Sequence, residues 1–268
     1  MTELSALNGR GLVLVGCGRM GSALLQGWLK QGLAASAVHV IDPNPRPELS
    51  ALGISVNGAL PADPAVLVIA VKPQMMADVL PRLAVGESTL VVSVAAGVTL
   101  AAYERAFPAA PIVRAMPNTP AAIGQGVSAI IGNAKAGAAE LELAEALMSA
   151  VGRVVRLESE GQMDAVTALS GSGPAYVFHM IEAMAAAGEA EGLPPALALE
   201  LARATVAGAG ALAVHEDEDP ARLREAVTSP GGTTAAGLKE LMDPETGLPP
   251  LMRRTIAAAA ERGRELGK

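Results

Sequence analysis

The sequence predicts an α/β domain built on a parallel sheet, followed by an all-helical domain. Three observations support this fold class. Short apolar runs alternate with helical patterns through residue 157, which is typical of parallel βαβ units. A glycine-rich turn follows the first of these runs. After about residue 160 the strand-like runs stop and Ala-rich helical stretches follow, so we assign residues 1–160 and 161–268 to the two domains.

The strands of the first domain are short runs of Val, Ile and Leu that end at turn-forming residues. They are expected at 11–15, 38–41, 66–71, 89–94, 112–116, 127–131 and 154–157. Helical patterns lie between several of them, for example at 20–31 and 136–151. Three prolines within 43–47 require a loop there, because proline lacks the N–H of regular structure.

The second domain contains only helical patterns. Helices are expected at 174–191, 195–215, 220–227, 233–242 and 251–266. Pro195 suits the first turn of a helix, where the missing N–H costs little. In the acidic run 216–219, Asp219 is placed to cap the next helix, with Pro220 at its first position.

The composition limits the class of protein. Of 268 residues, 51% are hydrophobic but only 2% are aromatic, so Ala, Val, Leu, Ile and Met must build the core. The net charge of −7, without a basic tract, argues against nucleic acid. Apolar runs such as 65–71 are shorter than the about 20 residues that span a bilayer. The single Cys17 excludes an internal disulfide. Residues 1–8 lack the basic and apolar pattern of a signal peptide. We therefore expect a cytoplasmic protein without membrane or nucleic-acid partners.

No pattern of metal-binding residues is present, so no metal site is expected. His39, His179 and His215 are isolated in the sequence and are interpreted as structural or surface residues. The reaction therefore should not need a metal or a strong protein base. Hydride transfer to an activated acceptor fits these features.

The segment Gly16-Cys17-Gly18-Arg19-Met20-Gly21 follows a strand and opens a helix, as the dinucleotide-binding fingerprint does. The first glycine makes the turn, the second admits the pyrophosphate and the third lets helix and strand pack closely. The first domain is therefore predicted to be Rossmann-like. Cys17 is interpreted as a small loop-filling residue rather than a redox thiol.

The residues leave the nucleotide preference open. Asp42 ends the second strand at the spacing where a carboxylate binds the adenine ribose hydroxyls, which favours NADH. An alternative is that Asp42 only forms the turn before Pro43. Arg46 and Asn57 are nearby polar residues that suit the additional phosphate of NADPH. NADPH and NADH are both retained as candidate cofactors.

Two further segments end predicted strands, where ligands of open α/β sheets bind. They are 70–73, Ala-Val-Lys-Pro, and 95–97, Ala-Ala-Gly. Their small residues let the backbone approach the nicotinamide-side ribose. Lys72 suits an acid–base role, although an exposed lysine beside the cofactor is the plainer interpretation.

A second anion site is predicted at 227–238, where a loop rich in hydroxyls and glycine enters a helical pattern. Small residues leave backbone N–H groups free to face an anion, and the helix N-terminus adds partial positive charge. The alternative is that Ser229 and Thr234 merely cap the helix. Two anion sites in one chain indicate a cofactor and a small acidic substrate.

Several of these motifs together resemble the pyrroline-5-carboxylate reductase family. They are Leu-Ser-Gly-Ser-Gly-Pro-Ala-Tyr at 169–176, Ser-Pro-Gly-Gly-Thr-Thr at 229–234, Met-Pro-Asn-Thr-Pro at 116–120, and the segments at 16–21 and 70–73. The resemblance spans nearly the whole chain. It implies a Rossmann-like domain followed by an all-α dimerisation domain, a homodimer or larger homo-oligomer, and reduction of 1-pyrroline-5-carboxylate to L-proline with NADPH or NADH.

The resemblance also implies roles for individual residues. The substrate carboxylate falls to Ser229, Thr233 and Thr234, and Glu160 and Thr167 align near the substrate. Thr234 is the candidate catalytic residue, since its hydroxyl suits a hydrogen bond to the imine nitrogen. The cofactor contacts carry over to Val15, Gly16, Cys17, Gly18, Arg19, Met20, Asn57, Ala70, Val71, Lys72, Pro73, Ala95, Ala96 and Gly97, with Asp42 beside them. Asp42-Pro43-Asn44 departs from the Ser- or Arg-containing turn of NADPH-preferring relatives.

Two alternatives remain from the residues alone. A β-hydroxyacid dehydrogenase shares the glycine start but needs a lysine early in the second domain, and no lysine occurs between Lys135 and Lys239. A nucleotide-sensing module without chemistry has no use for the loop at 229–234.

Overall fold

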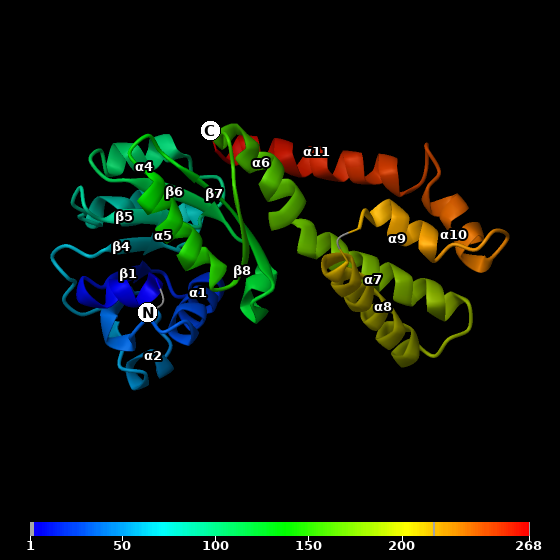
Figure 1. The fold of residues 1–268 in the computed structure, drawn as a ribbon, viewed down its shortest axis with the longest axis horizontal. Helices are drawn as coiled ribbons and strands as arrows, with labels where there is room; N and C mark the ends of the chain where they lie inside the picture. The colour runs from blue at the N-terminus through cyan, green and yellow to red at the C-terminus, as the bar shows by residue number, and fades with distance from the viewer. Residues whose placement is uncertain (1–2, 217, 268) are drawn as a thin grey trace. The chain divides into compact units, whose positions relative to one another are not determined.

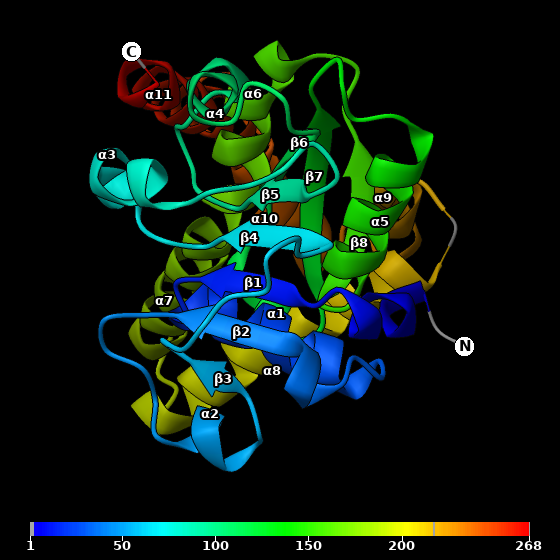
Figure 2. The same cartoon turned by 90° about the vertical axis from the view of Figure 1, so that its left-hand side faces the viewer.

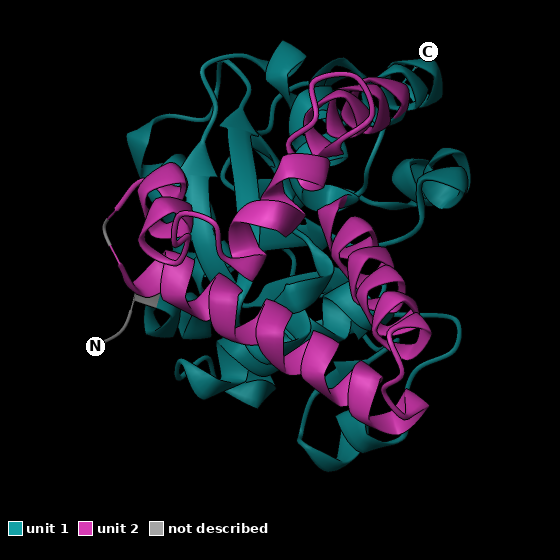
Figure 3. Cartoon of the chain, turned by 90° about the vertical axis from the view of Figure 1, so that its right-hand side faces the viewer, with its two compact units in different colours: residues 1–172, 259–268 teal, residues 173–258 magenta. Residues whose placement is uncertain are grey.

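The computed structural model describes residues 3–216 and 218–267, which form two compact units. One unit contains residues 1–172 and 259–268, and the other contains residues 173–258 (Figure 3). The sequence-based boundary after residue 160 lies earlier than this division. The difference has a packing cause, because Met163 and Ala168 are buried within the first unit and Gly263 approaches Asp164 there.

The first unit is built on one sheet (Figure 1), in which the described residues form eight strands in the order β3-β2-β1-β4-β5-β6-β7-β8. The strands are β1 Leu12–Val15, β2 Val38–Ile41, β3 Ser55–Val56, β4 Val66–Ile69, β5 Leu90–Ser93, β6 Ile112–Met116, β7 Gly126–Gly132 and β8 Gly152–Arg156. Figure 2 shows β1 between β2 and β4. All seven predicted strands are present. The two-residue β3 was not predicted, because a strand that short has no period to recognise.

The sheet is mostly parallel, as the alternation of strands and helices predicted, and the departure is at β7, which pairs antiparallel with β6. The chain between these strands contains only the 3₁₀ turn Thr119–Ile123. A parallel return needs a crossover of a dozen or more residues, so this short link requires a reversal. β8 returns parallel to β7 through the helix Ala138–Ser149.

Helices cover both faces of this sheet. They are α1 Arg19–Lys30, α2 Glu48–Ala51, α3 Met76–Val79, α4 Leu100–Ala106, α5 Ala138–Ser149 and α6 Met163–Val166; shorter 3₁₀ and π turns lie at Glu3–Gly9, Ala35–Ala37, Pro73–Met75, Leu80–Arg82, Thr119–Ile123, Glu160–Gln162 and Thr167–Gly171. Successive strand residues face opposite sides, so β1 places Leu12 and Leu14 against α1 and α5 and Val13 and Val15 on the α4 side. The buried Trp28 indole N–H donates to the Leu147 carbonyl over 2.8 Å and links α1 to α5.

The second unit is helical. It contains α7 Gly173–Ala190, α8 Pro195–His215, α9 Pro220–Ala226, α10 Thr233–Leu241 and the first part of α11 Leu248–Leu266. α7 and α8 pack together, with Ala185, Ala198 and Ala202 buried between them. The predicted cap of α9 is confirmed, because the Asp219 carboxylate accepts the Ala221 N–H over 2.7 Å.

The helix α8 departs from the expectation that no apolar run is long enough for a bilayer. Among the described residues it is the one helix whose length and hydropathy fit a membrane span, and 11% of that window is buried. Leu197, Leu201 and Leu212 are among its exposed side chains. Several exposed apolar side chains on one helix are typical of a surface for association.

Candidate active site

The glycine loop lies where the strand order reverses, between β1 and its neighbours β2 and β4. Gly16 has φ +90°, and a Cβ there would meet the Ala70 carbonyl at 2.9 Å. A Cβ on Gly21 would lie 2.2 Å from the Gly16 carbonyl oxygen, so the helix can approach the strand only without a side chain. Gly18 has nothing within 4 Å of its Cβ position and is exposed. This open position beside the start of α1 is where a pyrophosphate fits.

The segment 70–73 begins beside this loop, because the Ala70 N–H donates to the Val15 carbonyl over 2.7 Å. Lys72 and Pro73 are exposed at its far end. Within the described residues, the Lys72 ammonium has no hydrogen bond or ion pair, as expected of a solvated lysine at the edge of a ligand site.

Asp42 and Asn57 meet at the end of β2. The Asn57 amide accepts the Asp42 N–H over 3.0 Å and donates to the Asp42 carbonyl over 2.8 Å. Asn57 holds φ +50°, a left-handed conformation that asparagine tolerates better than most residues. The Asp42 carboxylate accepts N–H groups from Cys17 over 2.6 Å and from Asn44 over 2.8 Å. A carboxylate has about four acceptor positions, so capacity for ribose hydroxyls remains.

The environment of the loop thiol favours its protonated form. Cys17 is buried, and burial raises the pKa of its thiol, while a hydrogen bond with Ser22 partly opposes this effect. A thiol with a raised pKa stays protonated near neutral pH, and the thiolate is the nucleophilic form. This chemistry agrees with the interpretation of Cys17 as a loop-filling residue.

A cavity of about 390 Å³ lies beside the start of α1. It is lined by Arg19, Met20, Ser22, Ala23, Gln26, Arg46, Thr119 and Ala122. Arg19 and Arg46 lie on the side of the Rossmann fold that binds the adenosine half of a dinucleotide, where two guanidinium groups suit the additional phosphate of NADPH. The same edge therefore offers a carboxylate for NADH and guanidinium groups for NADPH.

Glu160 and Arg114 form an ion pair in the first unit, with 2.5 Å between Glu160 Oε1 and Arg114 Nη1. The same carboxylate oxygen accepts the Leu100 N–H over 2.7 Å. Sequence reasoning missed Arg114, although a charged residue inside the apolar run Ile-Val-Arg-Ala-Met was a visible signal. Thr167, the other residue aligned near the substrate, donates its hydroxyl to the Met163 carbonyl over 2.8 Å.

The loop at 229–234 lies in the second unit, and its hydroxyls do not cap α10. The N-cap is Gly232, without a side-chain hydrogen bond, and Gly231 has φ +72°. Ser229, Thr233 and Thr234 are exposed, and their hydroxyls have no hydrogen-bond partner among the described residues. The neighbouring Thr228 instead donates to the Arg224 carbonyl. The capping alternative is therefore not what the structure shows for Ser229 and Thr234.

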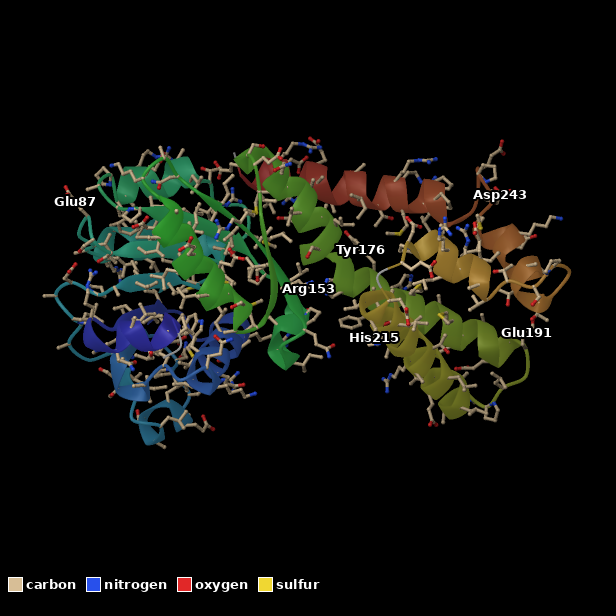
Figure 4. All side chains as sticks on the ribbon, in the orientation of Figure 1. Glu87, Arg153, Tyr176, Glu191, His215 and Asp243 are labelled. Atoms are coloured by element: carbon tan, nitrogen blue, oxygen red, sulfur yellow. The ribbon has the colours of Figure 1, made fainter. Side chains whose placement is uncertain are left out.

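The histidines do not form a site. His215 ends α8 at an exposed position (Figure 4), and His179 contacts Glu182 on the surface of α7. His39 lies in β2. Among residues 3–216 and 218–267, no cluster of His, Cys, Asp or Glu side chains is arranged to hold a metal.

Comparison with known proteins agrees with this geometry. Residues 160–266 match the family model described as pyrroline-5-carboxylate reductase dimerisation, and residues 12–97 match that of NADP oxidoreductase, coenzyme F420-dependent. Among curated proteins, the pyrroline-5-carboxylate reductases of Pseudomonas aeruginosa and Methanosarcina acetivorans are 39% and 40% identical. The matches cover 96% and 95% of this chain and 97% of each relative.

Solved structures are similar over the same length. A pyrroline-5-carboxylate reductase from Coxiella burnetii has a TM-score of 0.88 at 32% identity, covering 97% of this chain and 100% of that one. The Plasmodium falciparum pyrroline carboxylate reductase with NADP bound has a TM-score of 0.82 at 27% identity, covering 98% and 100%.

The Rossmann-like sheet, its glycine loop and these matches define an NAD(P)H-dependent oxidoreductase. The chain belongs to the pyrroline-5-carboxylate reductase family. The dimerisation family model covers α7 and α8, which supports a homo-oligomer, and several apolar side chains on these helices are exposed. The hydroxyacid dehydrogenase and nucleotide-sensing alternatives are not favoured.

Proposed function

We propose that this chain reduces 1-pyrroline-5-carboxylate to L-proline with NADPH or NADH, the last step of proline biosynthesis. The observation that carries the proposal is the loop at 229–234, whose hydroxyls have no hydrogen-bond partner in residues 3–216 and 218–267, in a chain that also holds a glycine loop of the dinucleotide-binding type. Family membership supports the substrate class.

The cofactor contacts are assigned to the carboxyl edge of β1, β2, β4 and β5. The proposed set is Val15, Gly16, Cys17, Gly18, Arg19, Met20, Asp42, Asn57, Ala70, Val71, Lys72, Pro73, Ala95, Ala96 and Gly97. The open space at Gly18 and the shared position of Asp42 and Asn57 support this assignment. The residues present fit a dinucleotide, which supplies the hydride when bound.

The substrate carboxylate is assigned to Ser229, Thr233 and Thr234. Backbone N–H groups at the start of α10 and the exposed hydroxyls beside them suit a small carboxylate. Thr234 donates or accepts a hydrogen bond at the imine nitrogen, with water as the ultimate proton source. Protonation of that nitrogen gives an iminium whose carbon is electrophilic. Hydride adds to that carbon to form the new C–H bond, and the π pair of the C=N bond moves to nitrogen as the lone pair of the secondary amine. The main contribution of the chain is positioning.

Glu160 and Thr167 are also proposed to lie near the substrate. Their described contacts are to protein groups, so these two assignments rest on the family motif alone. We further propose a homodimer formed by the helical domain 161–268, a cytoplasmic location, and no membrane or nucleic-acid partner. Light scattering of the purified protein tests the dimer: a monomer mass would contradict it.

The activity is tested by initial rates of dinucleotide oxidation with the imine, comparing NADH and NADPH. The expected result is oxidation that saturates with imine concentration. Oxidation that is independent of the imine would reject the proposed reaction while leaving dinucleotide binding intact.

A further inference from the structure

The backbone turn between β5 and α4 is held at its N-terminal end by a hydrogen bond to a buried hydroxyl. Ser93, the last residue of β5, accepts the Ala95 N–H at its Oγ over 3.3 Å. The Ser93 hydroxyl also hydrogen bonds the hydroxyl of Tyr103 in α4. Both Ser93 and Tyr103 are fully buried. The start of the 95–97 segment is therefore tied to a side chain that α4 itself supports.

The C-terminal end of the turn is held by a hydrogen bond to a carboxylate. Leu100 is the first residue of α4, and its N–H donates to the Glu160 carboxylate, which Arg114 holds in place. The Arg114 side chain is 6% exposed and that of Glu160 is 31% exposed. A cavity of about 390 Å³ lined by Gly97, Arg114 and Glu160 lies beside this pair.

The residues that make these two hydrogen bonds belong to one cluster of side chains. Ser93 and Arg114 are paired across the β5–β6 ladder, and Tyr103 lies one helical turn after Leu100. Arg114 is also close enough to lower the pKa of Tyr103, although burial dominates and raises it to about 12. The Tyr103 hydroxyl thus remains protonated at neutral pH and keeps its hydrogen bond with Ser93.

Stability alone does not account for this cluster. Desolvating an arginine and a glutamate can cost more than their attraction returns, and apolar residues of similar size often stabilise such a position as well or better. Hydrogen bonds from these polar groups reach the backbone at both ends of one segment. That segment contains Ala95, Ala96 and Gly97, which the proposed function places against the nicotinamide side of the cofactor.

We propose that Arg114, Glu160, Ser93 and Tyr103 are positioning residues that hold the 95–97 turn in its cofactor-binding conformation. The inference rests on the proposed cofactor role of that turn. It gives Glu160 an indirect role through the Leu100 N–H. It also predicts that a change of Glu160 alters cofactor binding before it alters binding of the imine.

The test compares two ligands by calorimetry in Glu160→Ala and Tyr103→Phe. One is whichever of NADPH and NADH the unaltered protein binds more tightly, and the other is ADP, which lacks the nicotinamide half. We expect each variant to bind the whole dinucleotide about tenfold more weakly and to bind ADP with unchanged affinity. The kcat should also fall, because a misplaced group can lower the rate by up to about 100-fold. Glu160→Gln keeps an acceptor oxygen for Leu100 and should recover part of the loss.

Arg10→Met is the matched control, because it also breaks an arginine–carboxylate pair, that of Arg10 with Asp63. Arg10 precedes β1 and Asp63 precedes β4, so this pair lies at the opposite end of the strands from the cofactor segments. Arg10→Met should leave both affinities unchanged. Equal dinucleotide affinity in all variants, with only a lower melting temperature, would overturn the inference. So would a raised KM for the imine in Glu160→Ala with unchanged dinucleotide affinity, since that pattern marks direct substrate contact. Binding is measured without imine, so failure of the proposed reaction would be seen separately. If Glu160→Ala does not fold, Tyr103→Phe and Glu160→Gln decide the question.

Discussion

The carboxylate of Asp42 accepts the backbone N–H of Cys17 over 2.6 Å, which joins the end of β2 to the glycine loop after β1. The contact places a negative charge beside the loop that is proposed to hold the pyrophosphate. Asp42 therefore has two roles to separate: closing the loop and selecting the ribose. Arg46 at the neighbouring cavity offers the opposite charge.

Nucleotide preference should follow these two charges. Asp42→Asn keeps an oxygen acceptor for the Cys17 N–H but removes the negative charge. We expect kcat/KM with NADH to fall while kcat/KM with NADPH is maintained or rises. Arg46→Ala should lower kcat/KM with NADPH by about tenfold, since a charged hydrogen bond contributes about 1.5–3 kcal/mol. Steady-state rates with both dinucleotides measure the ratio, and an unchanged ratio in both variants would remove these residues from nucleotide selection.

The glycines of the loop should divide into packing and binding positions. Gly21→Ala places a methyl group 2.2 Å from the Gly16 carbonyl oxygen, so we expect a loss of about 1–3 kcal/mol of unfolding free energy. A Cβ at Gly18 would meet no atom within 4 Å. The unfolding free energy of Gly18→Ala should therefore stay within about 1 kcal/mol of that of the unaltered protein, the usual effect of a glycine-to-alanine exchange. Its dinucleotide affinity should fall, because the methyl group occupies the pyrophosphate position. Urea unfolding and calorimetry separate the two effects; a destabilised Gly18→Ala with normal affinity would refute the division.

Stability at alkaline pH should depend on Tyr103. Burial raises the pKa of its hydroxyl from about 10 to about 12, so the folded state keeps a proton that the unfolded state releases between these values. The contribution is complete below pH 10 and is lost as pH rises toward 12. Two pKa units correspond to at most about 3 kcal/mol.

Tyr103→Phe removes this titration. Its unfolding free energy should fall less steeply than that of the unaltered protein between about pH 10 and 12, the range set by the two pKa values. Urea unfolding at a series of pH values measures both slopes. Identical slopes in the two proteins would show that Tyr103 is not the titrating group.

The sequence predicted the order of the strands along the chain, the change to helices and the Asp219 cap, because periodicity and capping are local signals. It did not predict the reversal of β7, which depends on the length of the link from β6. The cluster of Arg114, Glu160 and Tyr103 was also missed. Its members lie in three different elements, and only the folded sheet determines that they meet.

The candidate site shows the same limit. Motif spacing located the glycine loop, and the structure adds that Asp42 contacts Cys17 and Asn57. The roles of Ser229, Thr233 and Thr234 remain predictions. Their free hydroxyls follow from backbone geometry at Gly231 and Gly232, which residue types alone do not specify.

Loss of one hydroxyl should separate substrate binding from cofactor binding. Thr234→Ala should lower kcat/KM for the imine by roughly 10- to 100-fold, the range of a hydrogen bond to a charged group, with dinucleotide affinity nearly intact. Thr234→Ser keeps the hydroxyl and should recover most of the activity. Thr228→Ala is the control, because that hydroxyl is already bonded to the Arg224 carbonyl. Equal losses for imine and dinucleotide, or no loss, would defeat the role of Thr234.

The most direct measurement of the central claim follows a label from cofactor to product. The protein is incubated with 1-pyrroline-5-carboxylate and a reduced dinucleotide deuterated at the transferred position of the nicotinamide C4. We predict one L-proline formed for each dinucleotide oxidised, with one deuterium on the former C=N carbon. Dinucleotide oxidation without proline, or proline without the label at that carbon, would contradict hydride transfer to the imine by this chain.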